Sequence, residues 1–496
     1  MLRSATAERE PRSAGWGLIG IAAIAAIAVF VWQLTVIPAG NPFYGLFHNT
    51  VDLRVYLAGG RTVLRGDPLY NHAMLADLDF TYPPFAAVIF APLALASLAT
   101  AKILWWGAIG LALVATVLLG FRSLGYRVDA RLWVLSVLVA VASTALEPVR
   151  TTIWLGQVNI FLMLLILADL VFLDLRRPRS RLRGLWVGVA AGIKLTPGFF
   201  VVYLLVIRRW RAAVLAVVGF AVTVAIGFLV IPGDSRDYWT TYLGSADRVG
   251  RVDSPANQSV NGLISQLLAY FGATRYRHPY PDGGTVFQAP GWMWVPVAVV
   301  VVVLGLWAAV VAYRRGWRLL SVTITGMTGA AASPFSWGHH WVWFVPLLVV
   351  AIDVAYRGAL TDRRRVWWWL VPAALVVATF SWSYNWWTSG RYQTSDHAIA
   401  IGVFMMPRWA DTHWYDAAAV VFYSCAYLAV LLVTIIITLV AGRPRRSVAD
   451  VTDGQSDAAG DPEVTSASSG PGETTPVGAQ LPGQSTAGNA GDSPSL

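Results

Sequence analysis

WGLIGIAAIAAIAVFVWQLTVI, residues 16–37, is an uncharged, largely apolar run and the first of many along this chain. It exceeds the roughly 20 residues that an α-helix needs to cross the hydrocarbon of a bilayer, and it lacks the small-residue cleavage site of a signal peptide. Across the 496 residues, hydrophobic types make up 56% and charged types 13%, and the mean hydropathy is positive. A soluble protein of this length needs more charge to cover its surface. The composition therefore predicts an all-α, polytopic integral membrane protein.

Further apolar runs predict the other membrane helices. They fall near residues 103–121, 132–146, 153–174, 212–231, 291–312, 319–335, 340–356, 366–383 and 416–441. Residues 184–207 are also apolar but are broken at Lys194-Leu195-Thr196-Pro197, and proline there disfavours a continuous helix. We expect two short helical arms at this position. The run Pro83–Ser97 is only about 15 residues long, so we expect it to lie in or dip into the outer leaflet.

Short arginine clusters between the apolar runs predict the orientation, because cytoplasmic connections carry an excess of basic residues. The clusters fall at residues 3–12, 122–131, 176–183, 208–211, 314–318, 363–365 and 443–446. Placing them all in the cytoplasm leaves residues 38–102, 147–152, 232–290, 336–339 and 384–415 outside. Residues 184–207 must then go out and return as a hairpin. We expect about twelve crossings with both termini cytoplasmic, followed by a disordered, mildly acidic tail at 447–496.

Several functions are disfavoured by the residue types present. The net charge of +10 comes from short clusters between apolar runs, a distribution that argues against nucleic acid as a partner. Cys425 is the sole cysteine, which excludes an internal disulfide and a cysteine-based metal site. Asp77-Leu78-Asp79 matches the Asp-x-Asp signature of metal-dependent sugar transfer, but so short a match arises easily by chance. We therefore expect no metal and no cofactor.

The first outer segment, about residues 38–102, carries the best candidate for chemistry. Its stretch Asn49–Gly60 predicts a short helix at the membrane surface, in which Asp52 and Tyr56 lie one turn apart. An acid near an outer interface is also at home as a solvated surface group. Asp52 is not isolated, however, because polar residues gather at the other predicted outer ends. They are Glu147, Arg150, Gln157, Asn159, Lys194, Thr196, Asn257, Gln258, Ser259, Asn261, His339 and His340.

Polar side chains at membrane depth cost several kcal/mol unless they are satisfied, so their gathering on one face predicts a polar cavity there. Each member has an alternative role. Gln157 and Asn159 could form hydrogen bonds between helices, and Lys194 could extend to lipid headgroups. The two histidines are adjacent, so we expect only one of them to point into the site, and the sequence does not say which.

Seven short motifs follow one another in order between about residues 50 and 341. They are Asp-x-x-Val-Tyr from Asp52, Arg-Gly-Asp-Pro-Leu-Tyr from Arg65, Tyr-Pro-Pro from Tyr82, Gly-Gln-Val-Asn from Gly156, Lys-Leu-Thr-Pro from Lys194, Asn-Gln-Ser from Asn257 and Ser-Pro-x-Ser-x-x-His-His from Ser333. This ordered set resembles membrane glycosyltransferases of the GT-C fold. It is most similar to the actinobacterial polyprenyl-phosphate-mannose-dependent α-(1→2)-mannosyltransferases, which build phosphatidylinositol mannosides, lipomannan and lipoarabinomannan. The later helices match this family only in hydropathy, and the tail lies outside the resemblance.

The resemblance implies a GT-C-type transmembrane glycosyltransferase domain over residues 1–446, with juxtamembrane helices on the outer face of the plasma membrane. Asp52 corresponds in position to the family's catalytic base. The implied donor is polyprenyl-phosphate-mannose, used on the outer face without a metal, and the implied acceptor is a mannosylated glycolipid or lipoglycan.

Roles for the other polar residues follow from what this chemistry needs. Cations or donors must hold the departing lipid phosphate, and the candidates are Lys194, Arg150, Arg54 and His340. Candidate partners for the sugar hydroxyls are Tyr56, Gln157, Asn159, Asn257 and Gln258. Five tryptophans could stack on sugars or form an aromatic belt at the membrane interface: Trp337, Trp341, Trp386, Trp387 and Trp409.

Two other functions stay open at this level. A multi-pass lipid or sugar transporter or flippase would also suit about twelve crossings with a broken helix, although no similarity between two halves is visible. A related enzyme using another polyprenyl-phosphate sugar, such as arabinose, is the second alternative, because the contacts that read sugar hydroxyls are not visible in a sequence.

Overall fold

The computed structural model describes residues 11–35, 45–76, 78–173, 180–244, 250–280, 284–361, 363–381 and 414–441. The predicted disordered tail, 447–496, lies outside the described residues. So do Asp77 and the three tryptophans at positions 386, 387 and 409.

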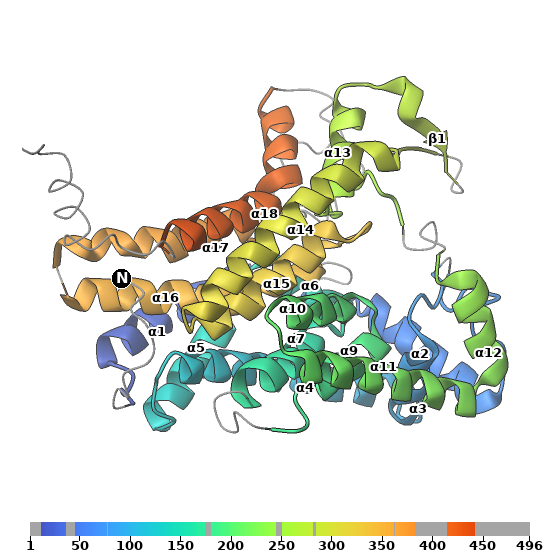
Figure 1. Cartoon of the computed structure of the whole chain (residues 1–496), viewed down its shortest axis with the longest axis horizontal. Coiled ribbons are helices and arrows are strands. Elements are labelled where there is room, and N and C mark those ends of the chain that lie inside the picture. The colour runs from blue at the N-terminus through green and yellow to red at the C-terminus, as the bar shows by residue number, and fades with distance from the viewer. Residues whose placement is uncertain are drawn as a thin grey trace, which may run out of the picture. The chain divides into compact units, whose positions relative to one another are not determined.

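Helices dominate the described ranges, in the order shown in Figure 1. The first half contains α1 (Trp16–Thr35), α2 (Val51–Arg65), α3 (Pro84–Ala94), α4 (Leu98–Ser123), α5 (Ala130–Ser143), α6 (Glu147–Leu155), α7 (Asn159–Leu167), the π-helix η1 (Ala168–Phe172), α9 (Leu185–Ile193), the 3-10 helix η2 (Thr196–Gly198), α10 (Phe199–Val206), α11 (Trp210–Val230), α12 (Pro232–Asp237) and the π-helix η3 (Tyr238–Tyr242). The second half contains α13 (Val260–Tyr270), η5 (Thr274–Tyr276), β1 (Arg277–Pro279), β2 (Thr285–Phe287), α14 (Gly291–Arg314), α15 (Arg318–Ala332), η6 (Gly338–Trp341), α16 (Phe344–Thr361), η7 (Arg363–Trp369), α17 (Leu370–Thr379) and α18 (Trp414–Ala441).

The described helices confirm a helical, multi-pass membrane protein. By length and composition, six of them could cross a membrane, namely α1, α4, α11, α14, α16 and the Ser424–Ala441 part of α18. A seventh candidate arises if the bent pair of α6 and the helix Asn159–Phe172 is taken as one span. The apolar helices α3, α5 and α17 are shorter, as is Thr196–Val206. The count of about twelve crossings is not confirmed and stays a prediction.

One local expectation was wrong. The run 153–174 was expected to be one span, but the chain bends by 120° between α6 and α7, because Gly156 adopts a left-handed conformation at the end of α6. In the outer segment 232–290, β1 and β2 form a short antiparallel pair. The expected short apolar piece near residue 83 is confirmed as the 11-residue helix α3.

The break predicted in residues 184–207 is present. α9 ends at Ile193, and Lys194 has an extended backbone with φ −149° and ψ 132°. The 3-10 turn η2 follows, and α10 begins at Phe199. Lys194 therefore belongs to neither helical arm.

The two arms form the predicted hairpin. α9 and α11 lie side by side (Figure 1), and they run in the same direction, because Gly184 faces Ala212 while Gly192 faces Thr223. A Cβ atom on Gly188 would collide with the backbone of α11, so the small residues of α9 allow this close approach. Since α10 joins the end of α9 to the start of α11, it must run back toward the level at which α9 and α11 begin. Lys194 consequently lies at the tip of the hairpin.

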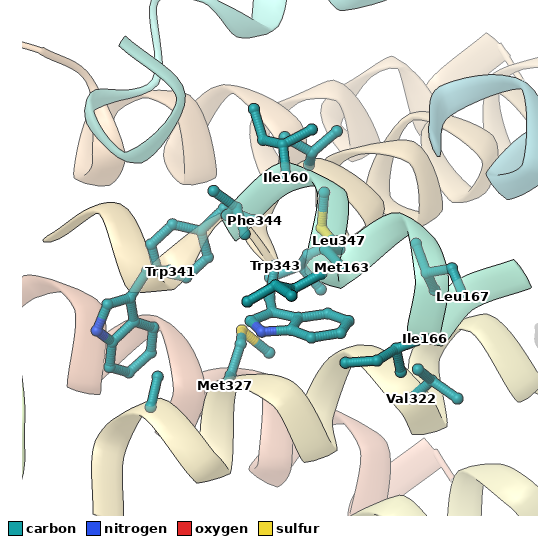
Figure 2. Packing of buried hydrophobic residues seen from close by; sticks show 14 of the residues in the cluster. Ile160, Met163, Ile166, Leu167, Val322, Met327, Trp341, Trp343, Phe344 and Leu347 are labelled. Atoms are coloured by element: carbon teal, nitrogen blue, oxygen red, sulfur yellow. The ribbon is translucent and has the colours of Figure 1, made fainter. Parts of the chain in front are cut away.

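A buried apolar core lies between α7, α15 and the start of α16. Figure 2 shows the Trp343 ring between Met163 of α7 and Met327 of α15, with Ile166 of α7 beside Val322 of α15. A Cβ on Gly326 would collide with the Trp343 ring, so this glycine makes room for the indole. The core holds η6, which carries His339 and His340, against the helices that carry the other polar residues.

Candidate functional site

The turn between α6 and α7 presents two polar side chains together. Gly156 has φ +72°, and a Cβ there would contact Leu53 Cβ at 2.8 Å, so glycine suits both the conformation and the space. The N–H of Gln157 then donates to Thr152 O at 2.8 Å. Gln157 follows this turn directly and Asn159 begins α7, which places both side chains at one end of the helices.

A hydrogen bond from the residue before α2 holds the start of this helix next to the same turn. Thr50, which precedes α2, has a left-handed backbone with φ 48°, a conformation that costs a non-glycine residue about 1 kcal/mol. Its N–H donates to Trp154 O of α6 at 2.8 Å, which helps to hold this conformation. The contact sets the start of α2 beside the α6–α7 turn and brings Asp52 to Gln157.

Asp52 is anchored by a hydrogen-bond network centred on Gln157. Gln157 Nε2 donates to Asp52 Oδ2 at 2.6 Å. Gln157 Oε1 accepts from Tyr56 OH at 2.9 Å and from Tyr82 OH at 3.2 Å. The second carboxylate oxygen of Asp52, Oδ1, has no hydrogen-bond partner among the described residues. The network orients the carboxylate while leaving one oxygen for a ligand.

Lys194 is held in a neighbouring part of the same network. Its Nζ donates to Asn159 Oδ1 at 3.1 Å and lies 2.9 Å from His340 Nε2. Nζ also lies 5.3 Å from the centre of the Tyr82 ring, a favourable cation–π position. Asn159 in turn donates to the backbone carbonyl of His339 at 3.0 Å. The hairpin tip, α7 and η6 thus meet around one ammonium group.

Asp52, Gln157, Lys194 and their neighbours line a cavity of about 500 Å³, a volume typical of small-molecule sites. The predicted residues on its wall include Asp52, Tyr56, Gln157, Lys194, Thr196, Trp337 and His340, whereas Asn159 and Trp341 do not line it. Both His339 and His340 line the cavity, contrary to the expectation that only one would reach it, because η6 is a tight 3-10 turn that follows the cavity wall. Among the described residues, no group of three or more His, Cys, Asp or Glu side chains could hold a metal ion.

Several cavity residues were not predicted. Tyr82 was noted only as part of a motif, yet it contacts both Tyr56 and Gln157. Tyr238 and Tyr242, from the π-helix η3 that follows α12, add an aromatic wall. The Tyr-Pro-Pro motif was the available signal for Tyr82, whereas Tyr238 and Tyr242 look like ordinary interfacial aromatics in the sequence.

Two predicted phosphate-binding arginines lie elsewhere. Arg150 is 1% exposed within α6 and interacts electrostatically with the neighbouring Glu147. Glu147 itself accepts hydrogen bonds from Thr151 and from Tyr427 of α18. Arg54 is exposed on α2, and neither arginine lines the cavity. The structure brings Lys194 and His340 to the cavity but not these two cations.

Asn257 and Gln258 do not line the cavity either. Asn257 Oδ1 accepts the backbone N–H of Ser336 at 2.9 Å and the hydroxyl of Ser259 at 2.9 Å. The N–H of Gln258 donates to Ser336 O at 2.7 Å. Both residues therefore tie the loop before α13 to the segment that carries Trp337 on the cavity wall.

We expect Asn257→Ala to lower stability rather than substrate affinity. The substitution leaves the buried Ser336 N–H without its acceptor, which costs about 1–3 kcal/mol. The melting temperature of the purified protein should fall, while KM values measured below that temperature stay near the wild-type values. A raised KM with an unchanged melting temperature would instead indicate direct contact with a sugar.

Burial and charge set the ionisation of the acid on the cavity wall. Burial raises the pKa of Asp52 to about 6, although the Gln157 hydrogen bond and the Lys194 charge both favour the carboxylate. Near neutral pH the carboxylate therefore remains ionised but is a stronger base than a solvated aspartate. An oriented carboxylate and an ammonium group on one cavity wall can accept a proton and stabilise an anion.

Comparison with known proteins identifies a family and relatives for this chain. Residues 80–334, which include Tyr82, Gln157 and Lys194, match the model of glycosyltransferase family 87. The polyprenol-phosphate-mannose-dependent alpha-(1-2)-phosphatidylinositol pentamannoside mannosyltransferase of Mycobacterium tuberculosis is 36% identical over 332 residues, 65% of this chain and 71% of that protein. The polyprenol-phosphate-mannose-dependent alpha-(1-2)-phosphatidylinositol mannoside mannosyltransferase of Mycolicibacterium smegmatis is 31% identical over 410 residues, 75% of this chain and 83% of that protein. No solved structure matches the chain. The extent and identity of these matches show that the chain belongs to glycosyltransferase family 87.

Proposed function

We propose that the protein transfers mannose from polyprenyl-phosphate-mannose to a phosphatidylinositol mannoside, forming an α-(1→2) linkage on the outer face of the plasma membrane. Acceptors of the lipomannan or lipoarabinomannan type belong to the same proposal. The observation that carries it is the presence of the Asp52 carboxylate and the Lys194 ammonium on one cavity of a family 87 protein. The similar mycobacterial proteins are named for this donor and this linkage.

Asp52 serves as the general base in this reaction. The acceptor hydroxyl oxygen attacks the anomeric carbon of mannose while the bond from that carbon to the phosphate oxygen breaks. The hydroxyl proton passes to Asp52, whose Oδ1 is open toward the cavity, and the bonding electrons leave with the phosphate. A single displacement of this kind inverts the anomeric centre, so a β-linked donor yields an α-linked product.

Lys194 stabilises the leaving group. The donor is a phosphodiester with one negative charge, and the released polyprenyl phosphate is a monoester that carries about −1.5 to −2 charges at pH 7. The reaction therefore places additional negative charge beside the phosphate, where a fixed cation lowers the barrier. The hydrogen bonds to Asn159 and His340 hold Nζ in place, and the His340 ring offers a second polar contact.

The arrangement of charge supports an outer-face site. Three helices, α9, α11 and α15, begin at or near an arginine: Arg183, Arg209 and Arg318 respectively. The chain reaches the cavity wall after the other end of each helix, at Lys194, Tyr238 and Ser333. The cavity thus lies at the ends remote from these basic clusters. Because such clusters favour the cytoplasm, this arrangement favours a cavity that opens outward.

The proposed function is tested by reconstituting the purified protein with polyprenyl-phosphate-mannose and phosphatidylinositol mannosides. We expect one mannose to be added per turnover, and the linkage analysis of the product to show α-(1→2). Polyprenyl-phosphate-arabinose serves as the competing donor in a parallel reaction. Transfer of arabinose but not mannose, or movement of the intact lipid without transfer, would contradict the proposal.

The transfer rate should depend on pH through Asp52. Since its raised pKa is about 6, the carboxylate is ionised above this pH and becomes protonated below it. We expect kcat/KM for the acceptor to be highest between about pH 6 and pH 7. It should fall by about tenfold per unit well below pH 6, and it should also fall above pH 7, because burial lowers the pKa of Lys194 to about 7 and its ammonium charge is lost there. Initial rates measured from pH 5 to 8 at low acceptor concentration check this, and a rate that stays constant down to pH 5 would contradict the assignment.

A further inference from the structure

α2 has a second polar face that the cavity does not use. At about 100° per residue, Arg54, Arg61 and Arg65 fall on one narrow stripe, nearly opposite Asp52. Arg54 and Arg65 are exposed and Arg61 is half-buried. Lys102 of α4 interacts electrostatically with Arg54, so it extends the stripe. These four residues are called the cationic face below.

No acidic partner neutralises the cationic face within the described residues. No ion pair joins any of its four side chains to a carboxylate there. Lys102 Nζ instead donates to the His48 carbonyl at 3.3 Å and lies near the Trp106 ring. Like charges four residues apart, such as Arg61 and Arg65, destabilise an isolated helix. The cationic face therefore does not stabilise the fold, whereas binding of an anionic partner would explain why these cations lie together.

Exposed apolar side chains accompany the cationic face. Leu64 of α2 is 51% exposed, Leu95 after α3 is 77% exposed and Ile103 of α4 is 69% exposed. α2 is fixed to α3 by a close approach, in which a Cβ on Gly60 would meet the Phe90 carbonyl group. Cationic and apolar surfaces on one packed unit are typical of a boundary between lipid phosphates and acyl chains.

We propose that the cationic face binds the phosphodiester of the acceptor glycolipid. This inference rests on the proposed function, in which the acceptor is an anionic phosphatidylinositol glycolipid whose hydroxyl reaches Asp52. The phosphodiester and the hydroxyl then lie on opposite faces of α2, and a helix with side chains is about 10–12 Å wide. The acceptor's glycan must pass around the helix, a path longer than this width, so the site selects lipids that already carry several sugars over bare phosphatidylinositol.

The test uses the full-length protein in proteoliposomes and the triple variant Arg54→Gln/Arg61→Gln/Arg65→Gln. Each arginine near a lipid surface contributes a factor of about five in binding, so we expect KM for the phosphatidylinositol mannoside to rise by about 100-fold. The donor KM and kcat should stay within a factor of about two, because the cavity is untouched. Arg54→Lys/Arg61→Lys/Arg65→Lys should restore most of the affinity, since it keeps the charges.

A matched control removes two exposed arginines away from α2. Arg275→Gln/Arg277→Gln deletes cations near the β1–β2 pair and should leave the acceptor KM unchanged. An unchanged acceptor KM in the triple variant would overturn the inference. So would an equal rise in the control, which would mark a general effect of surface charge.

A binding measurement separates this inference from the proposed function. Native mass spectrometry of the detergent-purified protein compares retention of phosphatidylinositol mannoside with that of phosphatidylcholine, and it needs no transfer. We expect the wild type to retain the anionic lipid preferentially and the triple variant to lose this preference. Equal retention of the anionic lipid by both proteins would overturn the inference. Absence of mannose transfer by the wild type would overturn the proposed function instead.

Discussion

Lys194→Met is expected to lower kcat for mannose transfer by about 10²–10³-fold, the usual effect of removing one group that stabilises charge in a transition state. Methionine fills a similar volume without the ammonium group. The leaving phosphate would then gain negative charge beside an apolar side chain. Because Lys194 lies at the tip of the α9–α10 hairpin, the substitution leaves the helices themselves intact.

The measurement must separate lost charge from lost structure. Single-turnover rates and donor KM are compared for Lys194→Met and Lys194→Arg, together with the melting temperature of each protein. The arginine variant keeps the charge and should recover part of the rate. Less than a tenfold loss of kcat in a folded Lys194→Met protein would contradict the role of Lys194 in stabilising the leaving group.

Asp52→Asn is expected to have the largest effect, a loss of up to about 10⁴-fold in kcat. Asparagine has nearly the same shape, and its carbonyl oxygen can still accept the hydrogen bond from Gln157 Nε2 that Asp52 Oδ2 accepts in the wild type. The network and the fold should therefore persist, while the proton acceptor is lost. Asp67→Asn is the matched control, because Asp67 is exposed just beyond α2 and does not line the cavity.

The helices and the gathering of polar groups could be predicted because membrane burial imposes strong rules. Apolar runs of about 20 residues mark spans, and Pro197 marked the break beside Lys194. Polar residues at membrane depth must satisfy one another, which is why Asp52, Gln157 and Lys194 were expected to meet. In the structure these three line one cavity.

The direction of individual side chains could not be predicted in the same way. Arg150 and Lys194 both lie at predicted outer ends, yet only Lys194 reaches the cavity. Arg150 is buried in α6, where it interacts with Glu147. Asn257 hydrogen-bonds a backbone segment that is distant in sequence. Such contacts depend on loop conformations that hydropathy and short motifs do not encode.

The most direct test of Asp52 as the base is a single-turnover experiment on the Asp52→Asn protein with polyprenyl-phosphate-mannose already bound. Donor binding and product formation are measured on the same preparation after the acceptor is added. The account predicts donor binding close to that of the wild type and almost no mannosylated product. Product formation at a rate near that of the wild type would contradict it.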